Sequence, residues 1–359
     1  MIQLDVAVPS EILFSHYVYE TPRAKSLESH YQALIGEIFD VCRLVGRGPP
    51  ERVYEMGSNN GEFLRALRGE FGGVTLGIEP AKNIATAANA AGITTLCTFL
   101  SKSTVPTILE YGPCDVLVAR HCMAHLDDLR GTLEAVRDLL TNDGLAVIEN
   151  AYVVDTINGT QFDQIYHEHH SYFALTPMAQ LLEAAGLHLR HAMHSPIHGG
   201  TIVMFATKKP GIHTDELKRM LSAEHRLVED LDAFAFRART CIAGIREGLR
   251  SYAFKTIDSY GATAKGNTLM SVLGPDAAHI RYAVDSTPSK HGKFLPGTGV
   301  KVVSEEYISS VAADPSRWPP DAYLLTAWNY EREILEKQAA YRAMGGKFIV
   351  PLPYPRLVY

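Results

Sequence analysis

The sequence predicts an α/β protein of two units joined by helices. Short aliphatic runs alternate with amphipathic segments in both halves of the chain, which is typical of mostly parallel, doubly wound sheets. Between the halves, Asp215 to about Arg250 carries apolar positions at helical spacing among many charges. The 359 residues also exceed what one ordinary core accommodates. We therefore expect a helical lead-in at 1–45, an α/β domain at 46–207, linking helices at 208–250 and a second α/β domain at 251–359.

Composition narrows the class of protein. Hydrophobic residues make up 46% and charged residues 21%, the balance of a folded protein that acts on a small molecule or binds one. A net charge of -6 without a Lys/Arg run offers no surface for a nucleic-acid backbone. No apolar stretch reaches about 18 residues and the N-terminus has no signal core, so we expect a cytoplasmic protein without a membrane partner. Whether it is a monomer or a homo-oligomer stays open.

The elements of the first α/β domain follow one another in a regular order. An amphipathic helix at Ser26–Leu44 precedes the Gly/Pro boundary GRGPP. A strand at Val53–Met56, a helix from Glu62 and a strand at Val74–Ile78 then form a β-α-β unit. The series continues with a helix at Ala81–Ala91, strands around Ile93–Cys97 and at Val116–Ala119, a helix at Leu129–Leu140, a turn at Thr141–Gly144 and a strand at Leu145–Glu149. An antiparallel pair, Leu187–His194 with Thr201–Ala206, is expected to close the domain.

A second α/β series begins at Ser251. Ser251–Tyr260 leads into the turn GATAKGNT. The later elements that we expect are strands at Ile280–Val284, Val300–Val303 and Ala322–Trp328, a helix at Glu331–Met344 and a last strand at Lys347–Pro351.

A cofactor site is indicated where the first strand turns into a helix. In EMGSNNG the glycines let the backbone approach a ligand at a helix N-terminus, but the dinucleotide pattern G-x-G-x-x-G is absent. An acid at the end of the next strand, Glu79, suits the two hydroxyls of a ribose. Together these features favour S-adenosylmethionine, and generic α/β architecture is the alternative. The candidate cofactor-binding residues are Glu55, Gly57, Ser58, Asn60, Gly61, Glu79, Pro80 and His121.

A second cluster carries the candidate chemistry. The tract Gln161–Phe173 contains Tyr166, Glu168 and His169 and follows the strand Leu145–Glu149, so it lies beyond the carboxyl ends of the strands, together with His125. The spacing H-E-H-H is not the zinc motif H-E-x-x-H. A metal site and histidines that only satisfy buried hydrogen bonds are both alternatives to general acid–base catalysis, for which imidazole is suited.

The chain resembles the sugar C-methyltransferases that build branched deoxysugars, the group typified by the enzyme of tetronitrose biosynthesis. The likeness runs from about Phe14 to the C-terminus, over the motifs EMGSNNG, GIEP, the AH of HCMAH, FDQIYHEHHSYF, HGG, YGATAKGNTL, GKFLPGT, AWNY and GGKFIVPLP. It implies a Rossmann-like class I methyltransferase domain followed by a second, Rossmann-like domain. The activity that it implies is methylation of carbon in a nucleotide-linked keto-sugar, with S-adenosylmethionine as methyl donor and S-adenosylhomocysteine as product.

The resemblance also implies roles for individual residues. His169 is implied as the general base that removes a proton next to a ketone. Tyr166, Glu168 and His125 are implied as the groups that polarise the carbonyl, hold the base or stabilise the enolate. Residues implied in substrate binding are Tyr17 and Tyr19 of the lead-in, His198 of HGG, and Lys265, Asn267 and Thr268 of the second Gly-rich turn. No metal is implied in the reaction.

That second turn has a separate physical interpretation. In GATAKGNT the lysine precedes the glycine, so the Walker A order G-K-[ST] fails and ATP hydrolysis is not expected. A lysine at a helix N-terminus still suits a phosphate, and the resemblance implies the nucleotide diphosphate of the substrate. Simple packing of the turn is the alternative.

The chain departs from the family at its start. Family members usually begin with a zinc-binding module built on C-x-x-C pairs, and none of the five cysteines here forms such a pair. This departure puts the substrate in doubt. The alternatives are therefore an O-, N- or C-methyltransferase of a different small metabolite, and a non-catalytic binder of nucleotide or S-adenosylmethionine.

Overall fold

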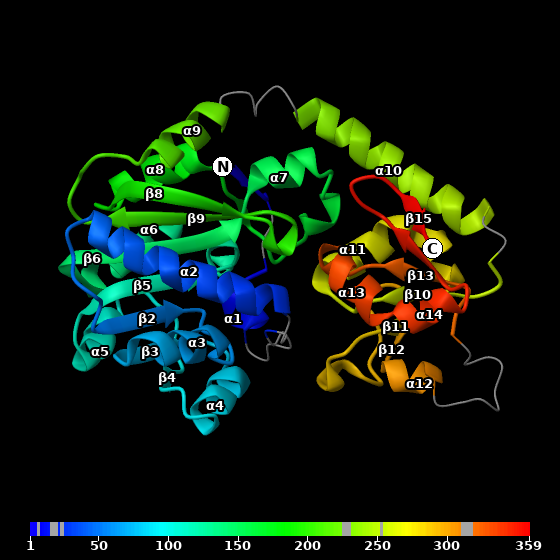
Figure 1. Cartoon of the computed structure of the whole chain (residues 1–359), viewed down its shortest axis with the longest axis horizontal. Coiled ribbons are helices and arrows are strands. Elements are labelled where there is room, and N and C mark those ends of the chain that lie inside the picture. The colour runs from blue at the N-terminus through cyan, green and yellow to red at the C-terminus, as the bar shows by residue number, and fades with distance from the viewer. Residues whose placement is uncertain (6–7, 15–20, 22–24, 225–230, 252–253, 310–318) are drawn as a thin grey trace. The chain divides into compact units, whose positions relative to one another are not determined.

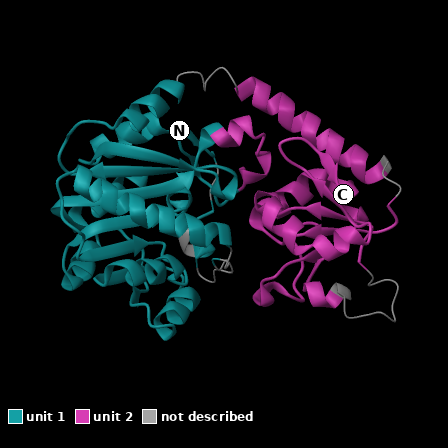
Figure 2. Cartoon of the chain, viewed as in Figure 1, with its two compact units in different colours: residues 1–154, 167–227 teal, residues 155–166, 228–359 magenta. Residues whose placement is uncertain are grey.

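The computed structural model describes residues 1–5, 8–14, 21, 25–224, 231–251, 254–309 and 319–359. The chain forms two compact units, coloured separately in Figure 2. Unit 1 comprises Met1–Val154 and His167–Leu227, and unit 2 comprises Asp155–Tyr166 and Val228–Tyr359. The segment Asp155–Tyr166 lies within the range expected for the first domain, yet it groups with unit 2. The chain therefore leaves unit 1, contributes this short segment to unit 2 and then returns to unit 1.

Unit 1 contains a seven-stranded sheet in the order β4-β3-β2-β5-β6-β9-β8, labelled in Figure 1. The strands are β2 (Arg52–Met56), β3 (Val74–Ile78), β4 (Thr95–Leu96), β5 (Cys114–Arg120), β6 (Leu140–Ala151), β8 (His188–Ser195) and β9 (Thr201–Thr207). From β4 to β6 the neighbours are parallel, and β9 pairs antiparallel with both β6 and β8. The predicted doubly wound sheet with an antiparallel addition is confirmed.

The helices of unit 1 come from amphipathic segments between the strands. They are α1 (Ser10–Leu13), α2 (Lys25–Leu44), α3 (Glu62–Phe71), α4 (Lys82–Ala90), α5 (Val105–Ile108), α6 (Leu129–Leu139), α8 (Leu175–Ala184) and α9 (Asp215–Ala223), with short 3-10 turns η1 (Leu109–Tyr111), η2 (Met123–His125) and η4 (Ile197–Gly199). A helix α7 (Val153–Asn158) continues from β6 into the segment that belongs to unit 2. The elements α5 and η1 were not predicted from the sequence.

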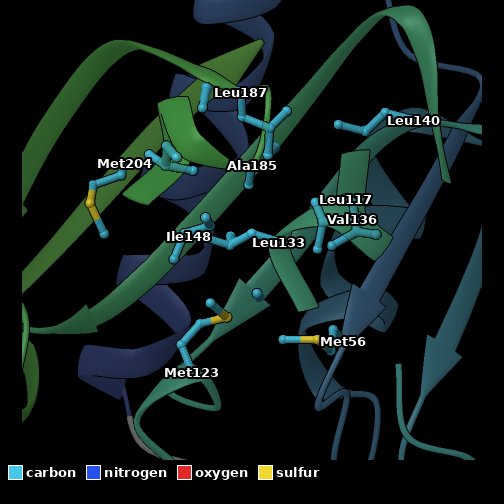
Figure 3. Packing of buried hydrophobic residues seen from close by; sticks show 14 of the residues in the cluster. Met56, Leu117, Met123, Leu133, Val136, Leu140, Ile148, Ala185, Leu187 and Met204 are labelled. Carbon is cyan, nitrogen blue, oxygen red and sulfur yellow. The ribbon is translucent and has the colours of Figure 1, made fainter. Parts of the chain in front are cut away.

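Alternating side chains on the central strands build two cores, one on each face of the sheet. Leu117 of β5 and Ile148 of β6 pack in one cluster with Leu133 and Val136 of α6, as Figure 3 shows. Val116 and Val118 of β5 face the other way, into a cluster that also contains α2 and α3. Because both faces of this parallel sheet are covered, the strands appear in the sequence as continuous apolar runs.

Unit 2 is built on a six-stranded sheet in the order β12-β11-β10-β13-β14-β15. Its strands are β10 (Ile257–Tyr260), β11 (Ile280–Val284), β12 (Lys301–Val303), β13 (Ala322–Leu325), β14 (Lys347–Val350) and β15 (Arg356–Val358), with only β14–β15 antiparallel. Its helices and 3-10 turns are η3 (Phe162–Gln164), α10 (Leu231–Ser251), α11 (Ala264–Leu273), η6 (Gly274–His279), η7 (Pro288–Lys290), α12 (Glu305–Ser309), η9 (Trp328–Tyr330), α13 (Glu331–Lys337) and α14 (Ala339–Ala343). Residues of α10 and α11 share one core with β10 and β13, while Ile334 and Tyr341 of α13 and α14 pack in another.

Several predicted boundaries were wrong for local reasons. The expected turn Thr141–Gly144 lies inside β6, where the register to β5 shifts between Leu140 and Leu145, so the extra residues form a bulge. The expected strand Ala322–Trp328 ends at Leu325. The expected helix Glu331–Met344 is broken at Gln338, whose side-chain amide donates to Glu305 and Tyr260.

Two pieces of sheet had no sequence signal. A two-stranded sheet joins β1 (Ile2–Gln3) to β7 (Ser171–Tyr172), and β15 pairs with β14 at the edge of unit 2. These strands are two or three residues long. A periodicity of two cannot be recognised over so few positions.

Candidate active site

The turn between β2 and α3 is tightly folded. Gly57, Asn59 and Gly61 all have positive φ angles, of 67°, 47° and 76°. A Cβ atom on Gly57 would lie 2.7 Å from Cβ of Cys122, and one on Gly61 would lie 2.8 Å from Cγ2 of Ile93. Both glycines are therefore required by conformation and by space.

Glu79 joins this turn to the end of β3. Its Oε2 accepts the backbone N–H of Asn59 at 3.0 Å and its Oε1 accepts that of Ala81 at 2.9 Å. Burial raises the pKa of Glu79, and these two amides oppose the rise. The carboxylate thus holds the Gly-rich turn in place, and each oxygen keeps a second lone pair for a ligand. Pro80, which follows it, is half-buried.

A buried ion pair lies at the ends of β2 and β5. Oε1 of Glu55 accepts from Nε and Nη2 of Arg120 at 2.9 and 2.8 Å, and Glu55 is fully buried. The guanidinium also lies 4.8 Å from the ring of Tyr31 and 4.5 Å from that of Phe63. Burial raises the pKa of Glu55 to about 7 against the opposing charge of Arg120.

Glu149 at the end of β6 is a functional candidate that the sequence reasoning missed. Its Oε1 lies 2.8 Å from Nε2 of His30 and 3.2 Å from Nε2 of His121. Nδ1 of His30 in turn lies 3.1 Å from Oγ of Ser195. Its position near the end of a parallel strand was the only available signal, because His30 comes from α2, 119 residues away.

His121 and His198 lie against each other in unusual backbone conformations. Their φ angles are 51° and 55°, and their ring centroids are 4.8 Å apart at an interplanar angle of 85°. Non-glycine residues in this region are uncommon and concentrate at functional sites. The structure thus brings together two residues that the sequence assigned to separate tasks, cofactor binding and substrate binding.

His125 and His169 form a second histidine pair. Their ring centroids are 5.2 Å apart, and Nδ1 of His125 lies 2.7 Å from the backbone oxygen of Glu168. His125 is buried, and this burial lowers its pKa to about 4. Glu168 is partly exposed, and burial raises its pKa while the charge of His167 opposes the rise. The tract is also held by His170, whose backbone N–H donates to Ala124 at 2.7 Å.

The remaining predicted residues fall into three groups. Tyr166 is half-buried and belongs to unit 2, whereas His169 belongs to unit 1. Lys265, Asn267 and Thr268 lie in the first turns of α11, after Thr263, whose hydroxyl caps the helix by accepting from Gly266. Tyr17 and Tyr19 lie outside the described residues.

Comparisons with known proteins agree over both units. A family model described as a methyltransferase domain matches residues 27–192, and one described as a C-methyltransferase C-terminal domain matches residues 196–353. The C-methyltransferase NovU of Streptomyces niveus is 34% identical over 368 residues, which cover 100% of this chain and 85% of NovU.

The chain belongs to this C-methyltransferase family. It is a methyltransferase that uses S-adenosylmethionine and transfers the methyl group to carbon. The family predicted from the motifs, the cofactor and the class of enzyme are thereby confirmed. Methylation of oxygen or nitrogen and a purely binding function are not supported.

Solved structures with a related fold cover about half of the chain. The plantazolicin methyltransferase BpumL in complex with SAH has a TM-score of 0.41 and 13% identity, covering 51% of this chain and 85% of BpumL. The YcgJ protein from Bacillus subtilis has a TM-score of 0.39 and 12% identity, covering 51% of this chain and 100% of YcgJ. At these TM-scores the likeness adds nothing to the assignment.

The polar atoms around the β2–α3 turn fit S-adenosylmethionine. Oε2 of Glu55, Oγ of Ser58 and Oδ1 of Asn60 are buried and have no hydrogen-bond partner among the described residues. Buried polar atoms are normally satisfied, so a polar ligand at this turn would remove a cost to the fold. The ribose, the ammonium and the carboxylate of S-adenosylmethionine are such groups.

Two absences can be stated for the described part of the chain. No three His, Cys, Asp or Glu side chains gather there in a way that could hold a metal ion, and the expectation of a metal-free reaction stays a prediction. Among the same residues, no helix is both long and apolar enough to cross a membrane.

Proposed function

We propose that the enzyme methylates the carbon next to a ketone in a nucleotide-linked deoxysugar, through an enolate. The observation that carries this proposal is the pairing of His169 with the buried His125, 5.2 Å apart by ring centroids. A carbon atom becomes a nucleophile only after it loses a proton. A C-methyltransferase of this kind therefore needs a base, and the half-buried His169 is our candidate.

The proposed first step moves one proton and two electron pairs. His169 takes the proton, the electron pair of the C–H bond forms a carbon–carbon double bond, and the carbonyl electron pair moves to oxygen. The developing negative oxygen needs a hydrogen-bond donor. The phenol of Tyr166 is our candidate for this donor.

His125 is suited to positioning the base. With a pKa near 4 its ring is neutral at pH 7. A backbone carbonyl only accepts, so the single ring proton lies on Nδ1 and is donated to Glu168. We assign to His125 the task of fixing the backbone that carries Glu168 and His169.

S-adenosylmethionine, when bound, supplies a methyl group on a sulfonium that a carbon nucleophile can attack. Glu79 would hold its ribose hydroxyls, because the carboxylate is fixed by two backbone amides and keeps free lone pairs. The turn residues Gly57, Ser58, Asn60 and Gly61, with Glu55, Pro80 and His121, would enclose the remainder.

The nucleotide handle of the substrate is assigned to unit 2. Lys265 provides a positive charge in the first turn of α11, where unpaired backbone N–H groups favour an anion. Oδ1 of Asn267 is buried and has no partner among the described residues, whereas the hydroxyl of Thr268 bonds to the backbone oxygen of Ala264. Asn267 is thus the stronger of these two candidates. His198 and the tyrosines Tyr17 and Tyr19 complete the proposed substrate-binding set.

A second candidate function shares the same chemistry. The enzyme would then methylate carbon in a keto compound that carries no nucleotide. The Lys265 turn would have only a packing role, and substrate affinity would not depend on a diphosphate.

The experiment that tests the base is deuterium exchange. Candidate nucleotide-linked keto-sugars are incubated with the enzyme and S-adenosylhomocysteine in heavy water, and deuterium next to the ketone is measured by mass spectrometry. We expect exchange with the parent enzyme and none with His169→Ala. Affinity for S-adenosylmethionine should stay within about twofold, because a local imidazole loss spares the cofactor turn.

The neighbouring exposed histidine provides the matched control. His167→Ala removes an imidazole two residues away and should keep both exchange and turnover, since 63% of that side chain is exposed. Exchange that persists in His169→Ala would refute the assignment of the base. A product methylated on oxygen would refute the enolate route altogether.

A further inference from the structure

Asp163 is a fully buried acid in the segment that unit 2 receives from the middle of unit 1. It lies in η3, within Asp155–Tyr166. Its Oδ2 accepts the indole N–H of Trp328 at 2.6 Å, and its Oδ1 is buried without a partner among the described residues. The roles proposed for His169 and for the β2–α3 turn do not require a buried carboxylate at this position.

Trp328 also contacts Lys265. Nζ of Lys265 lies 4.5 Å from the centroid of the Trp328 ring. Trp328 opens η9, shortly after β13, and Lys265 lies in α11, shortly after β10, and these two strands are parallel neighbours. One indole thus contacts the ammonium with its face and the carboxylate with its edge. Both geometries suit the charge distribution of the ring.

The charges of Asp163 and Lys265 affect each other. Burial raises the pKa of Asp163 to about 6, and the charge of Lys265 limits this rise. Burial lowers the pKa of Lys265 to about 8, and the charge of Asp163 opposes this fall. Within the described part of the chain, Cys241 of α10 also interacts with Asp163, and burial raises the pKa of its thiol to about 12, so it stays neutral.

We propose that Asp163 is a positioning residue that ties the segment carrying Tyr166 to the Lys265 turn, so that anion binding at this turn and catalysis are coupled. The inference rests on the proposed function of the Lys265 turn as the site for the substrate's anionic handle. Asp163 acts in two separable ways: its charge keeps Lys265 protonated, and its hydrogen bond with Trp328 fixes the segment three residues before Tyr166.

Two variants separate these two actions. Asp163→Asn keeps an oxygen that can accept from the indole N–H but removes the negative charge. Trp328→Phe keeps a ring face for the ammonium but removes the N–H that holds Asp163. For the binding measurements, both variants also carry Trp318→Phe. For turnover, they are made without this additional change. Lys265→Met is the reference for loss of the cation.

The first measurement is sulfate binding as a function of pH, followed by the fluorescence of Trp328 or, in Trp328→Phe, by calorimetry. Sulfate keeps one charge state across the neutral range, so the pH dependence reports the protein. In the parent, affinity should fall as pH rises through about 8, where Lys265 loses its proton. In Asp163→Asn the midpoint should move to lower pH, because the carboxylate that favours the ammonium is gone. In Trp328→Phe the midpoint should stay.

The second measurement is turnover with the substrate identified by the exchange experiment. We expect Trp328→Phe to lower kcat by about tenfold or more, because small displacements of catalytic groups have effects of this size. KM should change less than kcat. A purely structural role for Asp163 would instead lower activity and stability in both variants without moving the sulfate midpoint.

The outcomes distinguish the inference from the function on which it rests. An unmoved midpoint in Asp163→Asn, or a parental kcat in Trp328→Phe, overturns the coupling and leaves the anion site intact. Sulfate binding by Lys265→Met with parental affinity, or no sulfate binding by the parent, overturns the anion site and with it the coupling. The role of His169 as base is tested separately by deuterium exchange.

Discussion

Oε1 of Glu149 lies 2.8 Å from Nε2 of His30, and both side chains are buried. The same oxygen lies 3.2 Å from Nε2 of His121, at the edge of the proposed cofactor site. Burial alone would raise the pKa of Glu149, but hydrogen bonds and charges from His121 and His30 hold it well below its ordinary value. An ionised carboxylate therefore joins His121, a proposed cofactor-site residue, to helix α2.

Replacing Glu149 tests this link. Glu149→Gln should lower the free energy of unfolding by about 3 kcal/mol at pH 7, because a buried carboxylate that accepts from two histidines is lost. The folded pKa is below the unfolded one, so this stabilisation is present above the unfolded pKa and is lost as pH falls through the folded pKa. Urea unfolding should show the gap to the parent narrowing below about pH 4. The exposed Glu70→Gln should match the parent throughout.

The lowered pKa of His125 predicts a second dependence of the free energy of unfolding on pH. Its pKa of about 4 in the folded protein lies below that of an unfolded histidine, about 6.5, so the unfolded chain binds more protons between these values. The contribution of His125 to the free energy of unfolding has its full value above the unfolded pKa. It decreases by about 3 kcal/mol as pH falls toward 4. His125→Asn keeps a donor for the oxygen of Glu168 and should flatten this decrease in urea unfolding. If the stability of His125→Asn fell with pH as steeply as that of the parent, His125 would not be buried and neutral in the folded protein.

Glu79 should determine cofactor affinity. Glu79→Gln replaces one acceptor by an amide that faces a backbone N–H, so one of the two bonds that join this side chain to Asn59 and Ala81 is lost. We expect affinity for S-adenosylmethionine to fall at least about tenfold, the loss of one charge-assisted hydrogen bond. Calorimetry measures it, and the exposed Glu51→Gln is the control. Unchanged affinity in Glu79→Gln would remove this residue from the cofactor site.

Two glycines, one in the β2–α3 turn and one in α3, should respond in opposite directions to alanine. Gly57→Ala introduces a Cβ 2.7 Å from Cys122 at a φ of 67°, and should cost at least about 1 kcal/mol of stability together with cofactor affinity. Gly69→Ala lies in α3 with nothing within 4 Å, and should stabilise the protein by about 1 kcal/mol. Thermal unfolding with and without S-adenosylmethionine measures both. Equal effects would mean that the turn tolerates a side chain.

Local patterns were sufficient to predict the positions of many elements. The strands Val74–Ile78 and Ile280–Val284 have the bounds expected from the sequence, because buried parallel strands consist of short apolar runs between turn residues. The Gly-rich turn at Gly57 and the acid Glu79 lie close to each other as expected, since neighbouring parallel strands end at one edge. The break at Gln338 and the strand β15 could not be predicted, because each depends on partners that are distant in the sequence.

The sequence by itself determined the family, the cofactor class and the residue types at the carboxyl edges of both sheets. Only the tertiary structure decided which of these residues meet. The contact of Glu149 with His30 spans 119 residues, and that of Trp328 with Asp163 spans 165. Periodicity reports which face of an element is buried, but a contact between two polar side chains depends on how whole elements pack. The folded chain alone therefore revealed that Glu149 contacts His121 and that Asp163 bonds to the indole that contacts Lys265.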